Sequence, residues 1–79
     1  MSPSWRVKEY HLSFSSRDRG EPAHVHVQSE NGHAKLWLDP VRLEWSSGYN
    51  ERELRKIQRL VEDNREWLLD EWAQFWQAH

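Results

Sequence analysis

The sequence predicts one small α+β domain, in which an antiparallel sheet of three or four strands is covered by a C-terminal helix. Residues 1–48 alternate between apolar and polar side chains and carry turn signals, whereas residues 50–78 contain neither glycine nor proline. Strands followed by a helical part are typical of α+β domains. The chain has 79 residues and no cysteine, so we expect a single domain over residues 1–79 without a disulfide or a cysteine-based zinc site.

The first strand is expected within residues 5–16. Tyr10, Leu12 and Phe14 alternate with polar residues, but Trp5 and Val7 have the opposite parity. A β-bulge changes parity in this way. We therefore predict one strand that is bent near Lys8 or Glu9.

A hairpin is predicted around Asn31-Gly32, the preferred pair for a two-residue type I′ turn. This turn places Glu30 opposite His33 and, further along, His24 opposite Asp39 and His26 opposite Trp37. Opposed residues share a face, so the hairpin has two distinct surfaces. One surface carries Val25, Val27, Leu36 and Leu38, and the other carries His24, His26, Gln28, Lys35, Trp37 and Asp39.

A further short strand follows Pro40, where Val41, Leu43 and Trp45 alternate with charged residues. The helix is then expected to begin at Glu51, because Asn50 and Glu53 have the spacing of a capping box. Its apolar stripe continues to about Gln77, and a single helix of that length would reach about 40 Å. We therefore expect the helix either to be kinked or broken near Asp63-Asn64, or to overhang and need a partner.

Charge along this helix is segregated, with basic residues in its first half and acidic residues in its second half. That order opposes the helix macrodipole. It becomes favourable where the two halves fold back on each other or where two copies pair antiparallel. A homo-oligomer is one expectation that follows.

Composition limits the function classes. Six tryptophans offset a mean hydropathy of −1.06, because each ring can bury roughly 150–250 Å²; Trp45, Trp72 and Trp76 are expected on apolar stripes. No apolar run is long enough for a membrane span, and residues 1–14 lack the apolar core of a signal peptide. We expect a cytoplasmic protein that binds no membrane, and the net charge of −2 disfavours nucleic acid as a partner.

The His-x-His of Glu21-Pro22-Ala23-His24-Val25-His26-Val27 is the main candidate site. On a strand both imidazoles share one face, about 7 Å apart at the backbone. His24, His26 and Asp39 are candidate catalytic residues, and His24 and His26 are candidate ligands for a divalent metal. A purely structural alternative has His24 bonded to Asp39 and His26 stacked on Trp37. As a binding surface, the candidates are His24, His26, Trp37, Asp39, Lys35, Glu21 and His11.

The chain resembles a small bacterial family known as domain of unknown function 4160. The residues that carry the resemblance are the stretch Glu21 to Val27, Ala34 to Leu43, Gly48-Tyr49, Glu53-Leu54 and Asn64 to Trp72. Members usually have Pro-Pro before His-x-His, and Ala23 replaces the second proline here. The resemblance implies a prokaryotic cytoplasmic protein, often encoded beside a second small family, domain of unknown function 2442, in arrangements that look like toxin–antitoxin pairs. It names no catalytic residue and no cofactor.

Three functions remain open from the sequence. The first is a protein-binding component of a toxin–antitoxin-like pair, with a neighbour-encoded small protein as its partner. The second is a metal-dependent or histidine-based hydrolase or nuclease that uses the His-x-His face. The third is a homodimeric structural domain without chemistry.

Overall fold

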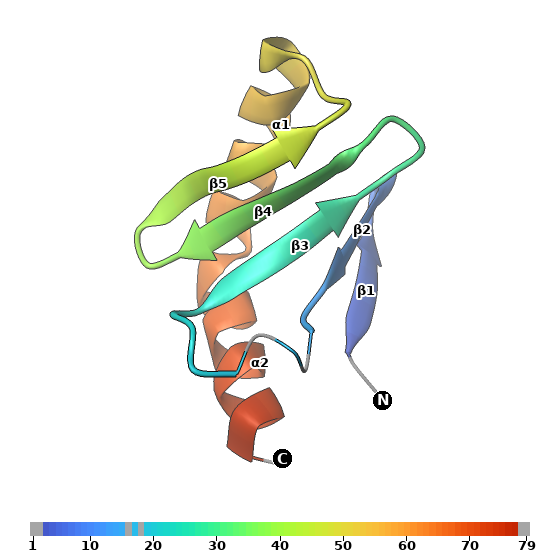
Figure 1. Ribbon diagram of the computed structural model, residues 1–79. Coiled ribbons are helices and arrows are strands. Elements are labelled where there is room, and N and C mark those ends of the chain that lie inside the picture. Colours follow the sequence, from blue (N-terminus) through green and yellow to red (C-terminus); the bar gives the residue numbers. More distant parts are fainter. Residues whose placement is uncertain (1–2, 16, 18, 78–79) are drawn as a thin grey trace.

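The computed structural model describes residues 3–15, 17 and 19–77. Five strands form one antiparallel sheet in the order β1-β2-β3-β4-β5, and two helices lie against one of its faces (Figure 1). The α+β class is confirmed, but the sheet has five strands rather than three or four. The elements are β1 (Ser4–Val7), β2 (Tyr10–Ser13), β3 (His24–Gln28), β4 (His33–Leu38), β5 (Val41–Ser47), α1 (Glu51–Asp63) and α2 (Arg65–Gln77).

The additional strand comes from the segment that we expected to be a single bent strand. Val7 pairs with Tyr10 across a turn at Lys8-Glu9, where Lys8 has a φ of 56°. A reversal at this point also brings residues of opposite parity onto one face, since Trp5 lies opposite Leu12. The parity change is therefore a hairpin turn and not a bulge.

The β3–β4 hairpin turns one residue earlier than predicted. Ser29 N donates to Gly32 O at 3.0 Å, and Gln28 rather than Glu30 lies opposite His33. The two residues at the turn are thus Glu30 and Asn31. Because each pairing shifts by two residues, the residues within the two strands keep their predicted faces. Asp39 falls outside β4, and Trp37 takes its place opposite His24.

Gly32 lies in a close backbone contact rather than at the centre of the turn, and this contact explains the shifted position of the turn. A Cβ at Gly32 would lie 2.1 Å from Ser47 O, and a Cβ at Gly48 would lie 2.1 Å from Asn31 O. The end of β5 therefore packs backbone to backbone against this turn. Tyr49 secures the contact, because its hydroxyl donates to Gly32 O at 2.9 Å.

The β4–β5 pairing contains a bulge between Lys35 and Leu36. Lys35 pairs with Trp45, whereas Leu36 pairs with Leu43, so Glu44 is the additional residue. The bulge turns Trp45 away from the helices, where 42% of its surface is exposed. The expected core position of Trp45 was therefore wrong.

Helix α1 begins as predicted, because Glu53 N donates to the Asn50 side chain at 2.8 Å. The C-terminal part is broken at Asn64 into two helices, which confirms the expected break, and it is not a single kinked helix. Asn64 ends α1 through its side-chain amide, which donates to Leu60 O at 2.8 Å. The two helices follow one another along the sheet instead of folding back (Figure 1), and neither is long and apolar enough to cross a membrane among the described residues.

The core lies between the helices and the covered face of the sheet. Trp72 and Trp76 pack against it, as expected from the apolar stripe, and Trp5 meets Trp67 edge to face at 4.9 Å. Burial of these rings supplies much of the apolar area of a short chain. The buried apolar side chains are Tyr10, Leu12, Phe14, Val25, Val27, Ala34, Leu36, Leu38, Ile57, Leu60, Val61, Leu68 and Phe75.

Candidate functional site

The sheet face opposite the helices carries the histidines. Strand alternation points one set of side chains of β3, β4 and β5 toward this face, and the register aligns them in rows. No helix covers the front of these three strands in Figure 1. We call this surface the histidine–tryptophan face and define it by His24, His26, His33, Lys35, Trp37 and Trp45.

His24 is the most enclosed member, with 0% of its surface exposed. Its ring lies 5.5 Å from that of Trp37 and 5.0 Å from that of Trp72, which reaches it from α2. His24 Nδ1 is 2.8 Å from Pro22 O. A carbonyl oxygen only accepts, so Nδ1 carries the proton and neutral His24 has its lone pair on Nε2.

His26 forms a pair with His33 of the neighbouring strand. His26 Nδ1 and His33 Nε2 are 3.2 Å apart, and Trp45 packs on His33 with ring centroids 4.9 Å apart. Burial, followed by the charge of protonated His26, lowers the pKa of His33 below its ordinary value of 6.5. The structure thus favours the neutral form of His33.

Lys35 and Trp37 occupy the middle of the face. Lys35 Nζ forms an ion pair with Glu21 Oε1 at 2.7 Å and lies 4.9 Å from the centre of the Trp37 ring. The Trp37 indole donates to Glu44 Oε1 at 3.0 Å. Glu21 Oε1 is also 3.8 Å from His24 Nδ1. The predicted residues Glu21, Lys35 and Trp37 therefore do lie together with His24.

Asp39 does not belong to this face. The shifted register places it in the turn after β4, where Asp39 Oδ1 accepts from Arg65 Nη2 at 2.6 Å. Arg65 Nε also donates to Leu38 O at 2.9 Å. The predicted hydrogen bond from His24 to Asp39 is replaced by the bond to Pro22 O, and the predicted stacking partner of His26, Trp37, lies against His24 instead.

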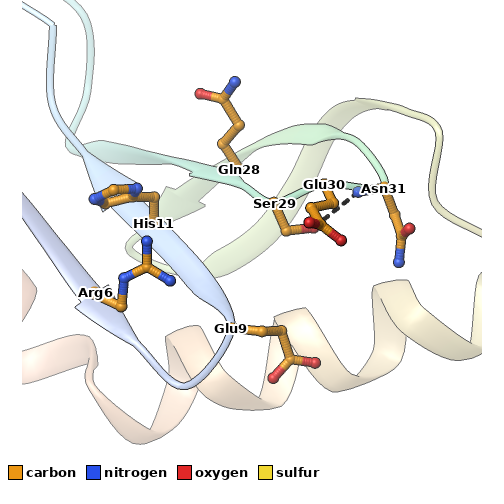
Figure 2. A pocket seen from close by; sticks show the side chains of 7 residues that line it. All are labelled: Arg6, Glu9, His11, Gln28, Ser29, Glu30 and Asn31. Atoms are coloured by element: carbon orange, nitrogen blue, oxygen red, sulfur yellow. Dashed lines mark hydrogen bonds between the residues drawn. The ribbon is translucent and has the colours of Figure 1, made fainter.

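His11 lies in a separate part of the open face. It pairs with Arg6 on β1 and with Gln28 on β3, and Ser13 is the residue opposite His26. Figure 2 shows Arg6 reaching toward His11 beside a polar hollow of about 570 Å³. The hollow is lined by Arg6, Glu9, His11, Gln28, Ser29, Glu30 and Asn31. His11 is therefore not brought into contact with the His-x-His pair.

His33 and Trp45 are site residues that the sequence analysis missed. His33 has the same parity as Lys35 and Trp37, so strict alternation along the strand indicates its position. No local pattern reveals Trp45, because its direction depends on the bulge at Glu44. No group of three or more His, Cys, Asp or Glu residues suited to a metal ion occurs among residues 3–15, 17 and 19–77.

Comparison with known proteins gives one result. No curated protein and no solved structure matches the chain. A family described as a domain of unknown function (DUF4160) matches residues 10–73. This range includes strands β2 to β5 and every residue of the histidine–tryptophan face. The chain therefore belongs to the DUF4160 family.

Proposed function

We propose that this protein is a protein-binding module, one half of a bacterial two-protein system of the toxin–antitoxin kind, and that it docks through the histidine–tryptophan face. One observation carries the proposal. Trp45 is 42% exposed on a sheet face that no helix covers (Figure 1). Tryptophan is among the residues that contribute most to binding energy at protein interfaces.

The proposed partner is a small cytoplasmic protein encoded next to this chain, as the family resemblance implies. Trp45 supplies the apolar anchor, and the neighbouring Lys35 is already neutralised by Glu21 at 2.7 Å. A paired charge costs less to remove from water than an unpaired one, and the centre of an interface is poor in charged residues. The partner's contact surface is therefore expected to be largely apolar.

The test is co-expression with the neighbour-encoded protein, followed by gel filtration with light scattering. A complex should form with the unchanged chain and weaken by about tenfold or more with Trp45→Ala, the loss typical of an interface hot spot. Trp67→Ala is a matched control, because Trp67 is 40% exposed but lies against Trp5 in another part of the molecule. No complex, or equal weakening by the two changes, would contradict the proposal.

The same experiment separates the two alternatives. A homodimeric structural domain predicts the mass of a dimer without any partner, and that mass should not respond to Trp45→Ala. The hydrolase alternative has less geometric support, since His24 is fully buried and Asp39 is bonded to Arg65. It predicts hydrolysis of RNA or a phosphoester that His26→Ala abolishes.

A further inference from the structure

The ring nitrogens of His26 and His33 lie close together on the histidine–tryptophan face, in an arrangement that partner docking does not require. The two residues lie on adjacent antiparallel strands and occupy diagonal positions of one face, because His26 pairs with Lys35 and His33 with Gln28. Diagonal neighbours are within reach of long or aromatic side chains. Their ring nitrogens, His26 Nδ1 and His33 Nε2, approach to 3.2 Å.

That separation is close to the one between two ligands of a tetrahedral metal ion. With zinc–nitrogen bonds of ~2.0–2.1 Å, two tetrahedral ligands lie ~3.3–3.4 Å apart. The hydrogen bond places a proton on one of the two nitrogens, so metal binding would displace that proton to the other nitrogen of the same ring. The separation of the two nitrogens would then change little. We propose that His26 and His33 form a two-nitrogen site for a divalent transition metal such as zinc, cobalt or nickel.

The surroundings suit this role. Trp45 packs against the His33 ring and shields one side of the pair. Lys35 is the cation on the strand position opposite His26, and Glu21 neutralises it at 2.7 Å. The His24 ring lies 5.5 Å from that of His26.

No group of three or more His, Cys, Asp or Glu residues suited to a metal ion occurs in the described part of the chain. The two imidazoles would therefore supply two of the ligands, and a tetrahedral ion would take two more beside them. The inference does not depend on the proposed docking function, since it concerns only the two imidazoles.

Titration of the untagged protein with cobalt(II) and zinc(II) at pH 7.5 tests the site. We expect one metal per chain and zinc-induced shifts of the His26 and His33 ring resonances in the nuclear magnetic resonance spectrum. His33→Gln should weaken binding by more than about tenfold, the smallest loss usual when even a supporting residue of a metal site is changed. His11→Gln is the matched control, because His11 is an exposed histidine on the same sheet face.

The wild-type resonance shifts keep the test decisive even where a variant fails to fold. Absence of stoichiometric binding would overturn the proposal and leave the pair as a hydrogen bond between the two imidazoles. Binding that His33→Gln retains, or that His11→Gln weakens equally, would also overturn it. Failure of these measurements would leave Trp45-dependent partner binding untouched, and the converse also holds.

Discussion

The phenol of Tyr10 on β2 donates a 2.9 Å hydrogen bond to Glu53 Oε2 on α1. Glu53 was expected to complete the cap of α1, but its carboxylate instead joins the helix to the sheet. Glu53 Oε1 also accepts from the Asn31 side chain at 3.4 Å. One carboxylate thus connects the first turn of α1 with strand β2 and with the turn between β3 and β4.

Tyr10→Phe should lower the free energy of unfolding by about 1.5–3 kcal/mol, the usual contribution of a hydrogen bond to a charged group. Burial and then the bond to Glu53 raise the pKa of Tyr10, so the phenol remains a donor throughout the neutral range. Urea unfolding measures the change. Glu51→Ala serves as control, because Glu51 is an exposed acid in the same helical turn; comparable losses from both changes would contradict the assignment.

Gly48→Ala should be far more destabilising than Gly20→Ala. The two glycines have nearly equal φ values, +90° and +91°, but a Cβ meets Asn31 O at 2.1 Å only at Gly48 and meets nothing within 4 Å at Gly20. Backbone strain costs ~1–3 kcal/mol at either position, and overpacking adds ~1–3 kcal/mol at Gly48. Thermal unfolding of the two variants measures the difference, and equal effects would show that the close approach at Gly48 contributes nothing.

Acidification should destabilise the protein through His33. Its pKa is lowered in the folded state relative to 6.5, so the unfolded chain binds the proton more readily. The contribution of His33 to the free energy of unfolding is therefore fully present above pH 6.5 and is lost as the pH falls below that value. Urea midpoints between pH 8 and pH 5 should fall less steeply for His33→Gln than for the unchanged chain. An unchanged slope in His33→Gln would contradict the prediction.

Asp39→Ala should change stability by less than about 1 kcal/mol, because its ion pair with Arg65 is exposed. Arg65→Ala should cost more, since Leu38 O also loses a donor. Asp39→Ala should leave cobalt binding at His26 and His33 unaffected. Unfolding and metal titration of both variants check this, and weaker metal binding in Asp39→Ala would mean that Asp39 acts at the histidine–tryptophan face after all.

The faces of the central strands could be predicted from the sequence because side chains alternate with a period of two. A register error of two residues preserves that alternation, so His24, His26, Lys35 and Trp37 remained on one face although their partners were wrong. The Asn50 cap could also be predicted, because it depends on residues only three apart. Local sequence patterns were therefore sufficient to predict the features that depend on residues close together in the chain.

Only the tertiary structure decided which of these residues meet. The turn lies at Glu30-Asn31 because Gly32 is needed for close contact with Ser47, a residue on another strand. This contact places Asp39 with Arg65, and the bulge at Glu44 places Trp45 against His33. By itself the sequence determined the class of the fold and the histidine-bearing face. The pairing of His26 with His33 depends on packing between strands, which no neighbouring residue encodes.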